Sequence, residues 1–358
     1  MSFFISENKP FLIAGPCSAE TREQVLKTAE GMKDLPLQLF RAGVWKPRTR
    51  PGSFEGKGKE ALEWLQEVKK EFGFKITIEV AEAEHVELAL QHGIDSVWIG
   101  ARTTVNPFQV QHIADALKGV EIPVMVKNPV NPDVDLWQGG IERIMTAGIK
   151  DVAAIHRGFS TYKTNSGFRN QPNWIIPVEL RRRIPGLPIF CDPSHITGKS
   201  SMVAQVAQKA MNIGFDGLMI ETHIQPNEAW TDAAQQITPA ELDELLKNLV
   251  IRKESAPEGT GLLELEYLRQ TADNIDAEII ELLARRMEIS GQMGVIKRQN
   301  NITAYQPERW REILESRCLQ GSRQSLDDQY IAALWQIIHD ESIKKQLELP
   351  VKKPGQNL

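Results

Sequence analysis

The sequence predicts an α/β chain, a (β/α)8 barrel followed by a smaller all-α domain. Short apolar runs of strand character recur eight times, about every 25 residues, and helical patterning follows each of them. Nearly every run also ends at a charged or metal-binding residue. The carboxyl ends of barrel strands form the catalytic face, so these side chains should meet at one mouth.

The eight runs define the expected strands. They are Phe11–Ala14, Leu37–Phe40, Lys75–Val80, Ser96–Ile99, Pro123–Val126, Val152–Ile155, Leu187–Phe190 and Gly217–Ile220. Stretches such as Glu60–Phe72 and Met202–Ile213 have the apolar spacing of the intervening helices. The side chains expected at the mouth are Cys17, Arg41, Lys46, Arg102, Lys127, Arg157, His195 and Glu221.

The chain has 358 residues, more than the roughly 250 of a bare barrel, so we expect two domains. We place the barrel at residues 1–250 and a linker at 251–261, where charge, Pro and Gly mix without apolar periodicity. Residues 262–358 should form the helical domain. The first strand begins near the start of the sequence, so we expect no regulatory domain before it.

Composition and charge exclude several classes of protein. The net charge of −5 gives no reason to expect nucleic acid or a membrane as partner, and no apolar stretch is long enough to span a bilayer. The three cysteines are scattered, which predicts no disulfide framework and fits a reducing cytoplasm. We therefore expect a cytoplasmic enzyme that acts on small anionic substrates.

Four candidate metal ligands follow the first, seventh and eighth strands: Cys17, His195, Glu221 and Asp232. One thiolate, one imidazole and two carboxylates suit a borderline divalent ion better than Mg²⁺ or Ca²⁺. We expect Mn²⁺ as the first candidate, with Co²⁺, Fe²⁺ and Zn²⁺ as alternatives. Taken singly, the cysteine could be a buried packing residue, the histidine an ordinary core or surface residue, and the aspartate a helix cap. Cys191 and Cys318 are interpreted as packing residues.

A second set of side chains at the strand ends is basic. Its members are Arg41, Lys46, Arg48, Arg102, Lys127 and Arg157. Arginine and lysine recognise phosphate and carboxylate, and so many cations in one cleft would repel one another without anions. This predicts more than one phosphorylated ligand. Solvated surface charge is the alternative, and it suits the helical run Arg181–Arg183 better.

The helical domain begins with an uninterrupted pattern from Leu262 to about Asn300, without Pro. Such a helix would be about 57 Å long, which a small bundle cannot cover alone. We therefore expect it to pair with a second copy, giving a homodimer or higher homo-oligomer. Two further helices are expected at Pro307–Leu319 and Leu326–Leu347.

Five motifs in residues 9–250 closely resemble 3-deoxy-D-arabino-heptulosonate 7-phosphate synthase, in the branch related to 3-deoxy-octulosonate 8-phosphate synthase. They are GPCS at Gly15–Ser18, RAGVWKPRT at Arg41–Thr49, GAR at Gly100–Arg102, DPSH at Asp192–His195, and the spacing from Glu221 to Asp232. The string at Lys46–Thr49 favours erythrose 4-phosphate over the arabinose 5-phosphate of the sister enzyme, which remains an alternative.

The resemblance implies a role for each of these residues. Cys17, His195, Glu221 and Asp232 would hold the divalent metal, and Arg102, Lys127 and Arg157 would bind phosphoenolpyruvate. Lys46 would act near the reacting centre and the phosphoenolpyruvate carboxylate, with Arg41 beside it. Arg48 and Thr49 would bind erythrose 4-phosphate.

Residues 262–349 resemble the all-helical type of chorismate mutase. The matching positions are Arg269, Arg286, Lys297, Ser342 and Gln346. Arg286 and Lys297 are 11 residues apart, which places them on one helix face, whereas Arg269 lies about 100° away and faces elsewhere. The resemblance implies that Arg269 reaches into the partner's site. By the resemblance the arginines hold the carboxylates of chorismate, and Lys297 and Gln346 donate to its ether oxygen.

One position departs from the mutase pattern. A glutamate that commonly receives a substrate hydroxyl is replaced by Trp310, with Gln306 one turn earlier as a candidate binding residue and Glu308 as a substitute if the register slips. The leading hypothesis is a bifunctional enzyme of aromatic amino acid synthesis that is inhibited by chorismate or prephenate bound to the tail. The alternative is a synthase with a non-catalytic helical domain for dimerisation and ligand sensing.

Overall fold

A computed structural model describes residues 3–5, 10–46, 52, 54–160, 167–252 and 262–348. The chain divides into two compact units, Met1–Glu254 and Ser255–Leu358. Each unit is described by itself. None of the described helices combines the length and the apolar composition that a bilayer span needs.

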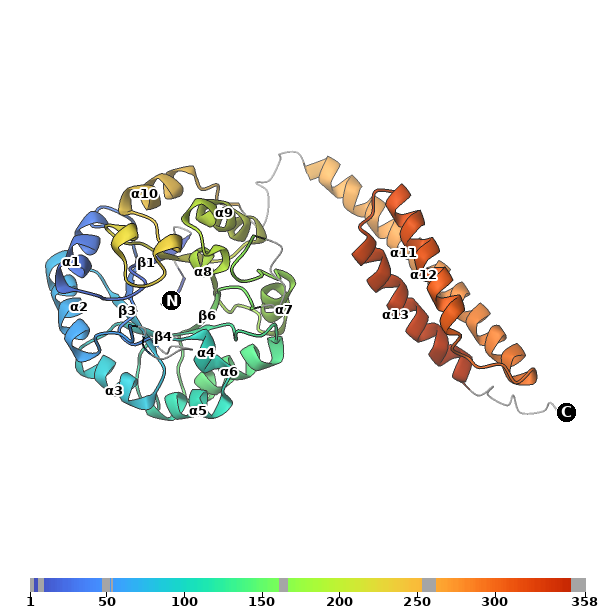
Figure 1. Cartoon of the computed structure of the whole chain (residues 1–358), viewed down its shortest axis with the longest axis horizontal. Coiled ribbons are helices and arrows are strands. Elements are labelled where there is room, and N and C mark those ends of the chain that lie inside the picture. Colours follow the sequence, from blue (N-terminus) through green and yellow to red (C-terminus); the bar gives the residue numbers. More distant parts are fainter. Residues whose placement is uncertain are drawn as a thin grey trace. The chain divides into compact units, whose positions relative to one another are not determined.

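The first unit is a closed barrel of eight parallel strands in chain order (Figure 1), which confirms the predicted fold class. The last strand pairs with the first, so that Glu221 lies opposite Gly15. The strands are β1 Phe11–Gly15, β2 Leu39–Ala42, β3 Ile76–Val80, β4 Ser96–Ile99, β5 Val124–Lys127, β6 Val152–His156, β7 Ile189–Cys191 and β8 Gly217–Glu221.

Helices surround the strands as the repeat predicts. They are α1 Arg22–Gly31, α2 Lys59–Phe72, α3 Ala83–Gln91, α4 Ala101–Thr104, α5 Pro107–Ala116, α6 Val134–Thr146, α7 Ile175–Arg183, α8 Pro193–Thr197, α9 Val203–Ile213 and α10 Pro239–Asn248. Short 3-10 turns are η1 Ser200–Met202, η2 Pro226–Glu228 and η3 Ala233–Gln235. The loop that holds η2 and η3 brings Asp232 over the mouth.

Six strands, β1, β2, β5, β6, β7 and β8, extend one or two residues further than the apolar runs predicted. Arg41, Lys127 and Glu221 lie within β2, β5 and β8, not after them. A charged side chain that points into the mouth does not interrupt the backbone ladder, so the hydrogen-bonded strand continues after the apolar run has ended. Strand β2 begins at Leu39, two residues later than predicted, because the side chain of Gln38 accepts a hydrogen bond from Leu12 N.

The barrel interior below the mouth is apolar. Phe4, Phe11 and Phe190 pack together with ring centroids 5.2 to 5.9 Å apart, and Trp98 is also fully buried in this layer. A second, larger core lies between the strands and the helices. Rigid packing on both sides of each strand fixes the side chains at the strand ends.

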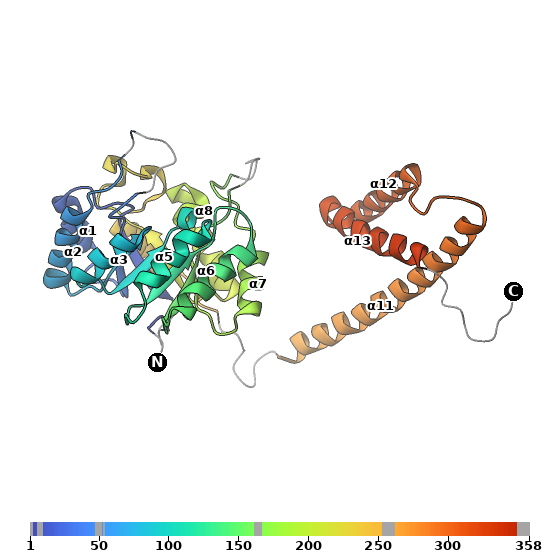
Figure 2. The same ribbon diagram turned by 90° about the horizontal axis from the view of Figure 1, so that it is seen from below.

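The second unit has three helices, α11 Leu262–Gln299, α12 Pro307–Arg323 and α13 Asp328–Leu347. Helix α13 packs against both α11 and α12, and the amino-terminal half of α11 extends beyond them (Figure 2). At Gly294 a Cβ atom would lie 2.5 Å from the carbonyl oxygen of Gln346, so a glycine is what lets α11 and α13 approach this closely.

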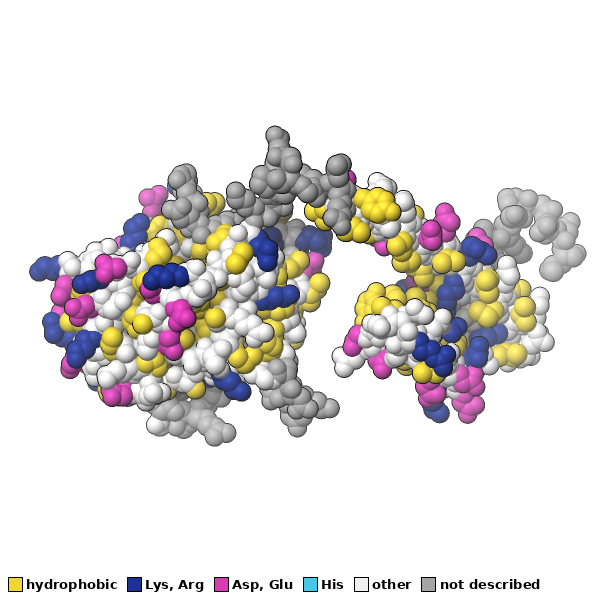
Figure 3. All heavy atoms as spheres, turned by 90° about the horizontal axis from the view of Figure 1, so that it is seen from above, with side chains coloured by type: hydrophobic (Ala, Val, Ile, Leu, Met, Phe, Trp, Pro, Cys, Tyr) yellow, Lys and Arg dark blue, Asp and Glu magenta, His cyan; other side chains and the backbone are white. Residues whose placement is uncertain are grey.

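Helix α11 carries many exposed apolar side chains, and hydrophobic side chains spread over the surface of this unit in Figure 3. They include Leu265, Tyr267, Leu268, Ile275, Ile279, Leu282, Ile289 and Ile296. Exposed apolar area of this extent is unusual for a monomer and is typical of an interaction surface.

Candidate active sites

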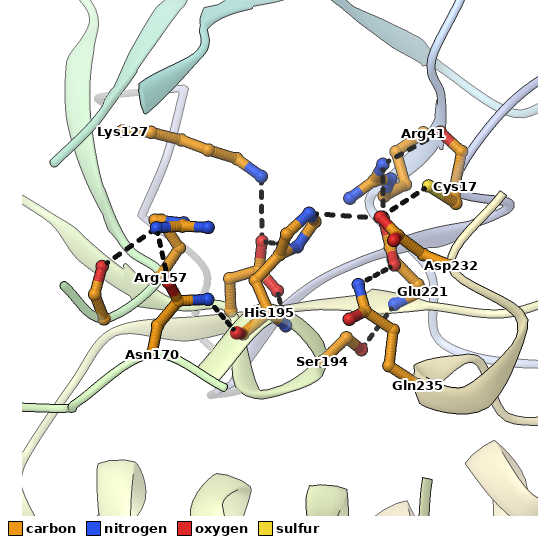
Figure 4. Close-up of polar contacts among 12 residues, drawn as sticks. Cys17, Arg41, Lys127, Arg157, Asn170, Ser194, His195, Glu221, Asp232 and Gln235 are labelled. Carbon is orange, nitrogen blue, oxygen red and sulfur yellow. Dashed lines mark hydrogen bonds and ion pairs between the residues drawn. The ribbon is translucent and has the colours of Figure 1, made fainter. Parts of the chain in front are cut away.

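Three of the predicted metal ligands meet at the barrel mouth. Ligand atoms of Cys17, Glu221 and Asp232 all lie within 4.8 Å of one another. Cys17 follows β1, Glu221 ends β8, and Asp232 lies on the loop after β8 (Figure 4). Asp232 starts η3, but its side chain makes no capping hydrogen bond, so the interpretation of this residue as a simple cap is not supported.

His195 lies beside this cluster. Its Nε2 atom is 3.7 Å from Oε1 of Glu221, and its Nδ1 atom is 2.8 Å from Oδ2 of Asp192. Asp192 caps α8, accepting a hydrogen bond from His195 N at 3.0 Å. The buried carboxylate therefore fixes the ring and directs Nε2 toward the other ligands, as an outer carboxylate does for a ligating histidine.

Negative charge is concentrated in this cluster. Burial and the nearby carboxylate of Glu221 raise the pKa of the Cys17 thiol to about 12. Burial would also raise the pKa of Asp232, but the charges of His195, Arg169 and Lys46 outweigh it and hold that pKa well below its usual range. Carboxylates crowded against a thiol favour a cation among them.

Basic side chains surround the cluster. Arg41 is buried and places one terminal nitrogen 3.2 Å from Oε1 of Glu221. Its Nε atom and other terminal nitrogen have no hydrogen-bond partner among the described residues. Nζ of Lys46 lies 3.0 Å from Sγ of Cys17. Both cations therefore adjoin the predicted metal ligands.

Three further residues, which were not predicted, support the candidate metal ligands directly or through the neighbouring backbone. Gln235 donates to Oε2 of Glu221 at 2.6 Å. Arg169 donates to Oδ1 of Asp232 at 2.9 Å and to Oε1 of Gln235 at 2.6 Å. The buried carboxylate of Glu20 accepts hydrogen bonds from the backbone N–H groups of Trp230 and Thr231. That contact supports Asp232, whose φ of 47° is rare for a residue with a side chain.

Of the residues that support the candidate metal ligands, only Asp192 could have been found from a sequence pattern. Asp192 precedes a proline and then the histidine, the arrangement of an N-cap before Pro at N1. Arg169 lies in an irregular segment, Gln235 in the short turn η3 and Glu20 before α1, where no apolar period marks their direction.

A second region of the mouth is cationic. Nζ of Lys127 lies 2.8 Å from Oδ2 of Asp192 and 5.7 Å from the centre of the Trp98 ring. Arg157 is 8% exposed and donates to Oδ1 of Asn170 at 3.0 Å. Asn170 in turn donates to the carbonyl oxygen of His195 at 2.6 Å. A hydrogen-bonded path thus joins the cationic region to the candidate metal ligands.

Arg157 is under electrostatic strain. Burial lowers the pKa of its guanidinium to about 10. The carboxylate of Asp192 opposes this shift, whereas the charges of Arg102 and Arg169 act in the same direction as burial. Arg102 lies on the short helix α4 and is exposed. A bound anion would relieve this repulsion. Arg48 and Thr49, predicted to bind the second phosphate, lie outside the described residues.

The helical unit brings several of its predicted residues together. Arg286 donates to Oγ of Ser342, and Ser290 bridges to the same hydroxyl at 3.2 Å. Burial lowers the pKa of Arg286, and so does the charge of Arg317. Lys297 donates to the carbonyl oxygen of Ala304 at 2.7 Å. Helices α11 and α13 therefore face each other through polar groups at this point.

Other mutase positions are placed differently. Gln346 is buried, and its Oε1 atom has no partner among the described residues. Arg269 is exposed near the amino-terminal end of α11, and one of its terminal nitrogens lies 3.7 Å from a carboxylate oxygen of Glu266. Gln306 precedes α12 without making a side-chain cap. Trp310 does not point to solvent but stacks on His339, with ring centroids 4.1 Å apart.

The donor set at the barrel mouth fits a borderline divalent ion. Sulfur and two carboxylates already converge, and an imidazole nitrogen faces one of those carboxylates. Cys17 would lose its proton on binding such an ion, because a coordinating thiol is deprotonated. Thiolate with imidazole and carboxylate is a poor set for Mg²⁺ or Ca²⁺.

Comparison with known proteins identifies the barrel. A family model described as the DAHP synthetase I family matches residues 3–256. The chain belongs to the DAHP synthetase I family. A phospho-2-dehydro-3-deoxyheptonate aldolase of Thermotoga maritima is 30% identical over 251 residues, which are 70% of this chain and 71% of the relative.

A solved structure and a sister enzyme agree with this assignment. The crystal structure of a Thermotoga maritima DAHP synthase superposes with a TM-score of 0.61 at 28% identity, covering 68% of this chain and 69% of that one. A 2-dehydro-3-deoxyphosphooctonate aldolase of Wolinella succinogenes is 28% identical and covers 68% of this chain and 99% of its own. The predicted kinship to both branches is therefore confirmed.

The model for chorismate mutase type II matches residues 268–347, which include most of α11 and all of α12 and α13. The DAHP synthetase family member is thus a bifunctional enzyme of the shikimate pathway, with a DAHP synthase domain and a chorismate mutase domain. This assignment supports two catalytic domains over a synthase with an inert tail.

Proposed function

We propose that the barrel condenses phosphoenolpyruvate with erythrose 4-phosphate in a metal-dependent reaction, and that the helical unit rearranges chorismate to prephenate. The convergence of Cys17, Glu221 and Asp232 beside buried cations is the observation that carries the first half. With His195 these three side chains would hold the ion, for which Mn²⁺ is the first candidate. When bound, the ion supplies a Lewis acid for the aldehyde oxygen.

The cations of the mouth orient the two substrates. Arg157, Lys127 and Arg102 are assigned to the phosphate of phosphoenolpyruvate, and Lys46 with Arg41 to its carboxylate. Carbon 3 of phosphoenolpyruvate adds to the aldehyde carbon, water adds to carbon 2, and inorganic phosphate leaves. Fixed cations contribute by proximity and by electrostatic preorganisation.

Substituting Arg157 by Ala tests this assignment. One cation that is buried and already repelled by its neighbours is lost, so KM for phosphoenolpyruvate should rise strongly, while KM for erythrose 4-phosphate changes little. Arg182→Ala on α7, whose side chain is exposed beside Glu179, is the control. Equal KM values for both variants would contradict the assignment. Preference for arabinose 5-phosphate in the unaltered enzyme would favour the octulosonate-type alternative.

The mutase half needs neither a metal nor a nucleophile. Arg286 beside Ser342 is assigned to a carboxylate of chorismate, and Lys297 and Gln346 to the ether oxygen, where negative charge grows as its bond to carbon breaks. Gln306 is assigned to substrate binding at the start of α12. The Arg286→Ala variant should lose chorismate turnover while its synthase reaction remains.

The site is proposed to form between two copies of the chain. The apolar side chains of α11 are exposed from Leu265 to Ile296, and Arg269 lies among them, away from Arg286. Pairing of α11 with its counterpart would bury that surface and bring the partner subunit's Arg269 to the site. Mass measurement in solution tests this: a monomer that turns over chorismate would contradict it.

We propose further that prephenate or chorismate bound to the helical unit inhibits the synthase. The proposal rests on the fusion of an early and a later step of one pathway in a single chain. Synthase rates should fall as prephenate is raised, and Arg286→Ala should shift that inhibition to higher prephenate concentration. A synthase rate that stays constant while prephenate saturates the mutase would contradict it.

A further inference from the structure

Helix α13 presents one polar face toward Arg286 and Lys297. Ser342 and Gln346 lie on this face, and His339 precedes them by three and seven residues, which places all three in one row. His339 follows Ile338, whose carbonyl oxygen lies 3.4 Å from a terminal nitrogen of Arg286. The imidazole therefore belongs to the same group of side chains, although it was not predicted.

Two aromatic rings fix the orientation of His339. Trp310 of α12 stacks on it at a centroid distance of 4.1 Å and an interplanar angle of 17°. Tyr305, in the turn before α12, lies 5.9 Å away at an angle of 59°. Tyr305 adjoins Ala304, which accepts the hydrogen bond from Lys297. The stacked imidazole is thus held beside both cations of the site.

The Nε2 atom of His339 is buried and has no hydrogen-bond partner within residues 262–348. A buried polar atom without a partner is costly unless something else binds it. Burial lowers the pKa of His339, and the charges of Arg286 and Lys297 act in the same direction, against the opposing charge of Asp340. The ring is therefore neutral near pH 7 and carries no charge that would repel the two cations.

We infer that His339, held by Trp310, binds the ring hydroxyl of chorismate through Nε2. The inference rests on the proposed mutase function. Chorismate offers two carboxylates and an ether oxygen, for which the cations and Gln346 serve, and one hydroxyl, which can donate to a neutral acceptor. The imidazole of His339 is such a group, and Trp310, where the mutase pattern has an acceptor, becomes the residue that positions the replacement.

A comparison of two substrates in the full-length enzyme tests this. His339→Phe keeps an aromatic ring against Trp310 but removes the nitrogen, whereas His339→Gln places an amide near the position of Nε2. We expect His339→Phe to lower kcat/KM for chorismate about tenfold, mainly through KM, as the loss of one hydrogen bond implies. His339→Gln should restore most of this loss. Synthase activity should not change in either variant, which controls for folding of the barrel, and the second substrate controls for folding of the helical unit.

The second substrate is a chorismate analogue with hydrogen in place of the ring hydroxyl. His339→Phe should leave its kcat/KM within about twofold of the unaltered enzyme, because the hydrogen bond is absent in both. An equal loss for chorismate and the analogue, or no loss for either, would overturn the role of His339 while leaving the mutase function intact. If the unaltered enzyme turned over no chorismate, the proposed function itself would fail and the inference with it.

Discussion

The Sγ atom of Cys17 lies 3.5 Å from Oδ2 of Asp232, although 215 residues separate them. Closure of the barrel makes this possible, because β8 pairs with β1 and brings the two ends of the sheet together. The two side chains then share a buried space with Glu221 and Lys46. The candidate metal centre is therefore a product of barrel closure.

Glu20 should matter for metal binding although it contacts no ligand side chain. Its carboxylate holds the N–H groups of Trp230 and Thr231, next to the strained Asp232. In Glu20→Gln the side-chain NH₂ group would face these backbone N–H groups, so that two donors oppose each other. The affinity for Mn²⁺ should therefore fall about 10–100-fold, as it does when residues that orient metal ligands are replaced in other proteins. Competition titration against a chelator measures this.

Glu23→Gln is the matched control for that variant. Glu23 lies three residues away on α1, pairs only with Lys27 among the described groups, and is largely exposed. Its replacement should leave the Mn²⁺ affinity unchanged. Equal affinities for the two variants would show that the Glu20 carboxylate does not support Asp232.

The contact between α11 and α13 predicts a difference between two glycines of one helix. A Cβ atom at Gly294 would collide with the backbone of Gln346, whereas at Gly291 nothing lies within 4 Å. Gly294→Ala should destabilise the helical unit by about 1–3 kcal/mol and lower chorismate turnover. Gly291→Ala should stabilise it by up to about 1 kcal/mol. Thermal unfolding with chorismate assays checks both, and similar behaviour of the two variants would contradict the close approach.

Acid should weaken the barrel through His156. This residue ends β6 among aromatic rings, and burial lowers its pKa from 6.5 to about 3. Between these values the unfolded chain binds a proton that the folded barrel does not, so the free energy of unfolding falls as the pH falls. From pH 7 to pH 5 the loss should be about 2 kcal/mol.

Urea unfolding of His156→Phe at the two pH values isolates this contribution. The variant cannot bind the proton, so its loss of stability between pH 7 and pH 5 should be smaller than that of the unaltered protein by the same amount. His112→Gln, at an exposed position on α5, is the control and should not change the pH dependence. Parallel pH dependences for all three proteins would mean that His156 is not buried in a neutral state.

The sequence predicts the barrel well because its signal is repeated eight times and each repeat is local. Strand ends are predicted less well, since β2, β5 and β8 include the charged residues Arg41, Lys127 and Glu221 that follow the apolar runs. The residues that hold the ligands are hardest to predict. Arg169 acts from an irregular segment and Gln235 from the short turn η3, and their direction depends on contacts across the mouth that no local period encodes.

In the helical unit, too, the helices are easier to predict than the contacts of single residues. Helix bounds follow from apolar periodicity and the prolines, so α11, α12 and α13 lie close to their predicted ranges. The role of Trp310 could not be predicted from the chain, because its partner His339 lies on another helix. The sequence shows that Trp310 departs from the family pattern. Only the packing shows that His339 lies against it.

We propose that Cys17 ligates a divalent ion together with the carboxylates of Glu221 and Asp232. Absorption spectra of the Co²⁺-loaded full-length enzyme test it most directly, because a thiolate bound to Co²⁺ gives a charge-transfer band in the near ultraviolet. The band should be present in the unaltered enzyme and in Cys191→Ala, whose thiol is buried in β7. It should be absent in Cys17→Ala, which should also lose synthase activity and keep chorismate turnover. A band that survives in Cys17→Ala would contradict ligation of the ion by Cys17.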